Sequence, residues 1–116
     1  MDNIEGILGS IKKLLGIDET YSQFDVDIVT YINSAFVTLS QIGIAPCNRM
    51  INGDVKWKDF FPDDESMVEM IKTYVYMRVR LMFDPPTSSV VMDTMKASIA
   101  EFEWRLQHMN ESHMEA

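Results

Sequence analysis

Hydrophobic residues recur along much of the chain with the 3.6-residue period of an α-helix. The clearest case is the segment 67–83, MVEMIKTYVYMRVRLMF, in which apolar side chains cover most of the helix circumference. Its polar side chains gather in one arc, formed by Glu69, Lys72, Thr73, Tyr76 and Arg80. The pattern predicts a central helix over about 64–83 that other elements cover on most sides. Its charged residues disfavour a membrane span.

Three further segments show helical spacing and predict helices over about 4–15, 23–42 and 89–109. Gly16 and Gly43 follow the first two as C-terminal caps. Ser22 and Asp25 resemble a capping box at the start of the second helix. The last helix carries a heptad-like seam of Met92, Met95, Ile99, Phe102, Leu106 and Met109. Beyond the seam the chain lacks a pattern, and residues 110–116 are expected to fray.

The helical period disappears over the connection 44–62. Asn52-Gly53 lies between two short apolar runs, which is typical of a tight β-hairpin. The same connection carries three bulky aromatic residues: Trp57, Phe60 and Phe61. They either fold back as a lid on the bundle or contact a neighbouring subunit or partner.

Two features of the central helix stand out. Arg78 lies within the apolar arc, so it needs a carboxylate, the carbonyl end of a helix or another chain as its partner. Glu101 and Glu103 of the last helix are the candidate carboxylates. The helix then stops at Asp84-Pro85-Pro86, because proline donates no backbone hydrogen bond and disfavours the α conformation in the residue before it. This corner is expected to fix the start of the last helix, which Thr87, Ser88 or Ser89 can cap.

Trp104 belongs to the last helix but lies off its heptad seam. It either touches another element of its own bundle or marks a surface that meets another chain. Together with the three loop aromatics, Arg78 and Arg80, it forms the set of candidate interface residues.

The composition fits one folded domain. The chain has 116 residues, of which 47% are hydrophobic, enough for one modest core. We therefore predict an all-α protein, a single domain over 1–116 built as a small bundle of four helices with a long loop. The net charge of −8 and the lack of a Lys/Arg cluster disfavour a DNA-gripping role. The single Cys47 and the absence of a signal-peptide pattern indicate a cytosolic protein, or a part of something assembled in a cytosol.

The sequence offers no arrangement of residues that supports catalysis, metal binding or cofactor binding. His108 and His113 do not share a helical face and are expected to be solvated. Cys47 has no nearby histidine and follows a proline in the loop. No glycine pattern suited to phosphate binding is present. We expect no enzyme activity and no cofactor.

The run YVYMRVRLMFDPPTSSVVMDTMKASIAEFEWRL, residues 74–106, resembles the C-terminal half of the small head–tail connector proteins of tailed phages, also called adaptor or head-completion proteins. The segments ILGSIKKLLGI near the N-terminus and LSQIGI at 39–44 are also similar to this family, whereas the loop 45–61 matches only loosely. The resemblance thus covers most of the chain.

The resemblance implies a structural virion protein that assembles in the host cytoplasm into a ring, commonly of about twelve subunits. Such a ring lies beneath the portal protein, gives the stopper or tail-completion protein its docking surface, and lets double-stranded DNA pass without specific binding. An acidic ring would repel the DNA phosphates. The alternative is a small acidic helical regulator that binds a host or phage protein.

Overall fold

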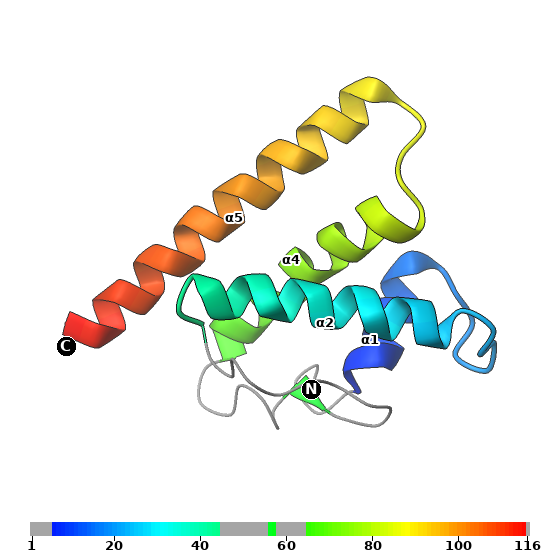
Figure 1. The fold of residues 1–116 in the computed structure, drawn as a ribbon, viewed down its shortest axis with the longest axis horizontal. Coiled ribbons are helices and arrows are strands. Elements are labelled where there is room, and N and C mark those ends of the chain that lie inside the picture. The colour runs from blue at the N-terminus through cyan, green and yellow to red at the C-terminus, as the bar shows by residue number, and fades with distance from the viewer. Residues whose placement is uncertain (1–5, 45–55, 58–64, 116) are drawn as a thin grey trace.

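The computed structural model describes residues 6–44, 56–57 and 65–115, and this part of the chain is all-α (Figure 1). Four helices follow one another: α1 (Ile7–Leu15), α2 (Asp25–Gln41), α4 (Glu65–Phe83) and α5 (Ser89–Glu115). An isolated antiparallel bridge joins Gly6 to Lys56. The predicted Asn52-Gly53 hairpin lies outside the described residues.

α4 is the central helix, as its sequence predicts. It packs against α1, α2 and α5. The side chains that it buries are Val68, Ile71, Tyr74, Val75, Met77 and Val79. α2 contributes a stripe of Ile28, Ile32, Ala35, Phe36 and Leu39 to the same core, and Ile7 and Ile11 of α1 complete it. The buried residues of α2 thus recur with the helical spacing on which the predicted helix over 23–42 rests.

Left-handed glycines end the first two helices. Gly16 has φ of 81°, and the amides of Gly16 and Ile17 bond back to carbonyls of the last turn of α1. Gly43 has φ of 90°, and the Ile44 amide bonds to the Leu39 carbonyl. Side chains with a Cβ rarely adopt this conformation, so glycine is the residue that suits both positions.

The capping box predicted at the start of α2 is wrong. The N-cap residue is Phe24, which makes no side-chain hydrogen bond to the helix. Its ring packs edge-on against Phe83 at 5.2 Å between centroids. The Asp25 carboxylate instead lies 2.9 Å from the Lys12 ammonium. An ionic contact with a buried lysine therefore replaces the expected cap.

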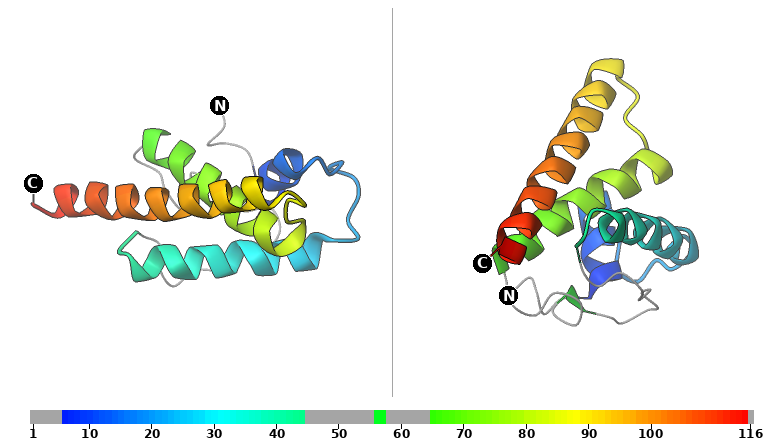
Figure 2. Two further views of the ribbon diagram at one scale, coloured as in Figure 1. Left: turned by 90° about the horizontal axis from the view of Figure 1, so that it is seen from above. Right: turned by 60° about the vertical axis from the view of Figure 1, so that its left-hand side comes forward.

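α4 ends at Phe83, just before Asp84-Pro85-Pro86, as the two prolines predict. The Asp84 amide makes the last helical bond, 2.8 Å to the Arg80 carbonyl. Ser88 then caps α5, because its side-chain oxygen accepts a hydrogen bond from the Val91 amide. α5 runs to Glu115, past the expected end at Met109, since nothing between Asn110 and Glu115 breaks a helix. Figures 1 and 2 show its first turns standing away from α2.

Candidate interaction surface

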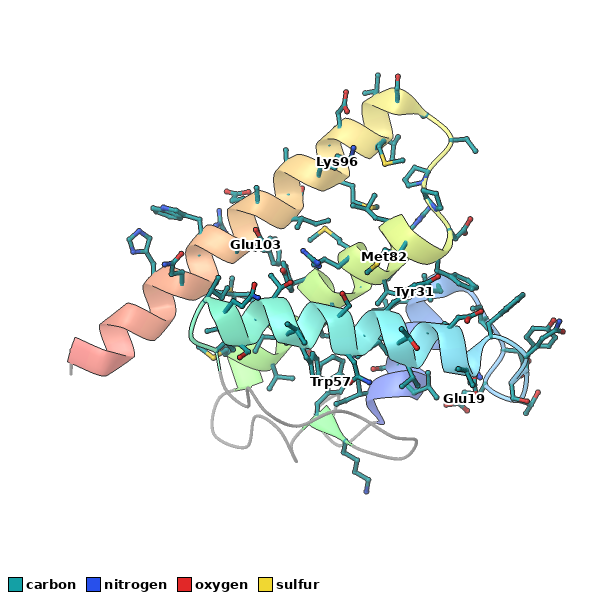
Figure 3. All side chains as sticks on the ribbon, in the orientation of Figure 1. Glu19, Tyr31, Trp57, Met82, Lys96 and Glu103 are labelled. Carbon is teal, nitrogen blue, oxygen red and sulfur yellow. The ribbon has the colours of Figure 1, made fainter. Side chains whose placement is uncertain are left out.

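Arg78 is held by α5. One guanidinium nitrogen lies 3.4 Å from Oε2 of Glu103, and the Tyr74 hydroxyl donates a 2.7 Å hydrogen bond to the same oxygen. The guanidinium also lies over the Tyr74 ring, 5.8 Å from its centroid. Glu103 projects from α5 toward α4 (Figure 3). The predicted pairing of Arg78 with a carboxylate of the last helix is thus confirmed, with Glu103 as the partner.

This cluster perturbs the acidity of Tyr74. Burial of the phenol raises its pKa well above the usual value, and the hydrogen bond to Glu103 raises it further. Nε of Arg78 is buried and has no hydrogen-bond partner within the described residues. Arg78 and Glu103 therefore form a partly buried ion pair between α4 and α5, in which one guanidinium nitrogen makes no hydrogen bond within the described residues.

Arg80 lies on the opposite, polar side of α4. Its guanidinium donates to the Tyr76 hydroxyl at 3.0 Å and to the Asp84 carbonyl at 3.4 Å. Both contacts lie within the last turns of α4 and the corner after it. In this structure Arg80 supports the Asp84-Pro85-Pro86 corner.

Of the three aromatic residues in the loop, Trp57 is the one that the structure describes. Trp57 is fully buried, and its ring lies 6.4 Å from that of Phe36, centroid to centroid, at a tilt of 56°. Its indole N–H donates a 2.7 Å hydrogen bond to Ser10 Oγ, which in turn donates to the Ile7 carbonyl. Trp57 therefore folds back onto the bundle, the first of the two alternatives for it. Phe60 and Phe61 lie outside the described residues.

Trp104 is the most exposed aromatic residue of the described helices, at 61%. Its ring meets His108 of the same helix edge-on at 4.0 Å, and an exposed pair of Arg105 and Glu101 lies beside it. His108 is exposed, as expected. Trp104 thus presents an apolar surface on α5, away from the seam formed by Ile99 and Leu106.

The sequence reading missed a buried cation, Lys12. Only 2% of it is exposed, and its ammonium donates to the Glu19 carbonyl at 3.0 Å and the Tyr21 carbonyl at 2.7 Å. With Asp25, these contacts tie α1 to the turn that leads into α2. Lys12 follows Leu8 by four residues and precedes Leu15 by three, so its place on the apolar side of α1 was a signal available in the sequence.

A groove of about 240 Å³ separates the C-terminal half of α4 from the first half of α5. Its lining residues are Arg78, Leu81, Met82, Lys96 and Ile99. Figure 3 shows Met82 and Lys96 on the two helices that border it. The floor of the groove is apolar and its charged groups are cations, although the whole chain is acidic.

The described residues form neither a cluster suited to a metal ion nor a helix suited to a membrane. Residues 6–44, 56–57 and 65–115 contain no group of three His, Cys, Asp or Glu side chains that could hold a metal ion. No helix in this part of the chain combines the length and the hydrophobicity that crossing a membrane requires.

The chain was also compared with known proteins. No curated protein and no solved structure matches it significantly. Residues 7–113 match the family model described as phage connector protein. This match covers α1, α2 and α4 and all but the last two residues of α5, and it includes the stretch 74–106 on which the resemblance rested. The chain therefore belongs to the phage connector protein family.

Proposed function

We propose that this connector protein forms a ring between the capsid portal and the stopper or tail, and that the ring completes the head after DNA packaging. The match of residues 7–113 to the phage connector family is the observation that carries the proposal. A structural virion role at the head–tail junction follows from the family. The ring, the portal and the stopper as partners, and assembly in the host cytoplasm are the further steps proposed here, with 1–116 acting as a single domain.

The charge of the chain supports passage of DNA through such a ring. Each copy carries a net charge of −8, so a closed ring of copies carries a large negative charge in total. A negative wall repels phosphates and lets the duplex move without binding, although salt screens this repulsion beyond about 8 Å. Base-specific contacts are not part of this role.

Trp104 is our candidate for contact with another protein. Its side chain is 61% exposed, and tryptophan is enriched among residues that dominate binding energy at protein interfaces. Phe60 and Phe61 remain candidates on sequence grounds. Arg78 and Trp57 already have partners within the chain, so we assign them to the fold.

The test is the size and shape of the assembly with and without portal protein. Purified full-length chain is mixed with the portal protein of its phage and examined by sedimentation and electron microscopy. We expect rings coaxial with the portal. A monomer in isolation is compatible with the proposal if rings form on the portal. Monomers and dimers alone, at high concentration with portal present, would refute it.

Trp104→Ala tests the proposed contact of Trp104 with another protein. We expect it to keep its helical circular dichroism while its binding to the portal or to the stopper weakens about tenfold or more, which corresponds to about 1.4 kcal/mol. Val90→Ala, which also removes exposed apolar area from α5, is the control for these two partners. Equal binding by the Trp104 variant and the unchanged chain would exclude Trp104 from both contacts.

A further inference from the structure

The outer face of α2 is unusual for so acidic a chain, because it is almost free of charge. Its exposed residues are Val26, Asp27, Thr30, Ser34, Val37 and Gln41. No charged residue occurs between Ile28 and Gln41. The Thr30 hydroxyl donates to the Val26 carbonyl at 2.9 Å, so its hydrogen bond is made within the helix. Covering this face therefore costs little desolvation.

Val26 makes this face apolar where α2 begins. Its side chain is 79% exposed, the highest value among the large hydrophobic residues of the described chain. Asp27, beside it, is also exposed and has no ion-pair partner within the described residues. The face thus combines a convex uncharged surface with one free carboxylate at its end.

The α4–α5 groove has complementary properties. Met82, which lines it, is 41% exposed. Arg78 is already paired with Glu103. Lys96 is exposed and makes no ion pair within the part of the chain that the structure describes. The groove is therefore concave and apolar, and the Lys96 ammonium at its border has no ion-pair partner within the described residues.

These two surfaces cannot cover one another within a single chain. α2 packs its inner face on α4, and Figures 1 and 2 show the first half of α5 apart from α2. Two different complementary surfaces on one protein generate a head-to-tail contact, which closes into a ring when the rotation between copies allows it. Each copy has a net charge of −8, so contact through surfaces with few charges also limits the electrostatic repulsion between copies.

We propose that the outer face of α2 in one copy packs into the α4–α5 groove of the next copy, with Asp27 facing the neighbour's Lys96. This inference rests on the proposed ring and names the surfaces that build it. The occupant is a second copy because α2 supplies the matching pair of properties, an apolar helix face and an unpaired carboxylate. A helix face seated in an apolar groove is a common mode of recognition between proteins.

Charge reversal provides the first test. Asp27→Lys and Lys96→Asp each place like charges together, and we expect each to weaken association of the full-length chain about tenfold. The chain that carries both reversals restores the opposite charges and should recover most of the loss. Lys13→Asp, an exposed reversal outside both surfaces, is the control. Additive losses in the double variant would overturn the contact between Asp27 and Lys96.

Cross-linking provides the second test and does not depend on charge. Val26→Cys and Met82→Cys are introduced together in a Cys47→Ser background, and the assembled protein is oxidised. A head-to-tail contact gives a ladder of covalent multimers, whereas each single-cysteine variant gives none. Dimers from Val26→Cys alone would instead show that two α2 faces meet, and would overturn the proposal.

The outcomes separate this inference from the proposed function. Rings that form on the portal without a cross-linked ladder and without charge rescue would overturn the α2–groove contact and leave the connector role intact. The absence of any ring with portal present would refute the proposed function, and this inference with it. A ladder together with rescue by the double reversal establishes the contact.

Discussion

The Tyr74 hydroxyl donates a 2.7 Å hydrogen bond to the Glu103 carboxylate, and this contact joins the buried face of α4 to α5. Arg78, one turn along α4, shares the same carboxylate oxygen. α5 has few other polar ties to the bundle in the described chain, so its position depends on this contact and on the burial of Ile99 and Leu106.

Removing the hydroxyl tests this dependence. We expect Tyr74→Phe to lower the free energy of unfolding by about 1 to 2 kcal/mol, because a hydrogen bond to a charged group is lost while the ring is kept. Urea denaturation measures the change. Glu101→Gln is the control, since its pair with Arg105 is exposed and should contribute about 0.5 kcal/mol or less. Equal effects of the two substitutions would contradict the importance of the Tyr74 contact.

The raised pKa of Tyr74 predicts a loss of stability at alkaline pH. In the unfolded chain a tyrosine ionises near pH 10, whereas the folded protein holds Tyr74 protonated to higher pH. The stabilising contribution is therefore complete below about pH 10 and is lost as pH rises toward the folded pKa, by up to about 1.4 kcal/mol per pH unit. Urea denaturation of the unchanged chain and of Tyr74→Phe between pH 8 and pH 11 should show their difference shrinking. A constant difference would contradict the prediction.

Lys12 should be a strong determinant of stability. Lys12→Met keeps most of the packing volume but leaves Asp25 and two backbone carbonyls without their cation. We expect a loss of about 2 to 4 kcal/mol, measured by urea denaturation. Lys13→Met changes an exposed neighbour and should alter stability by about 0.5 kcal/mol or less. A loss from Lys12→Met no larger than that of the control would show that water replaces the cation without penalty.

Two glycines of the first helical region should respond in opposite directions. Gly16→Ala forces a Cβ into the left-handed conformation and should cost about 1 kcal/mol. Gly9→Ala lies inside α1, where an added Cβ meets Glu19 Oε1 at an ordinary 3.5 Å, and should stabilise by about 0.5 to 1 kcal/mol. Thermal unfolding of both variants checks the signs. A shift of the same sign in both would contradict the assigned end of α1.

The helices could be predicted because their apolar spacing matches the faces that they bury. The stripe of α2 and the apolar arc of α4 correspond closely to the observed core. The end of α5 was missed because the heptad seam reports where a helix packs and says nothing of how far it continues. Nothing after Met109 breaks the helix, so it extends to Glu115 without a seam.

The polar contacts were predictable only in part. Spacing left Glu101 and Glu103 open as partners of Arg78, and the orientation of α5 decides between them: Glu103 faces Tyr74, whereas Glu101 pairs with Arg105 on the exposed side. The partners of Lys12 include backbone carbonyls at Glu19 and Tyr21. Carbonyl positions depend on the path of the turn, which residue identity does not encode directly.

The hydrogen bond between Trp57 and Ser10 also has a consequence for synthesis. The two residues are 47 positions apart, so α1 leaves the ribosome well before the tryptophan that holds it. At about 5 to 20 residues per second, α1 waits several seconds for this anchor. Lys96 and Ile99, which complete the α4–α5 groove, are made later still. A nascent chain therefore exposes the outer face of α2 before its own groove is complete, and under the proposed contact only finished copies carry both surfaces.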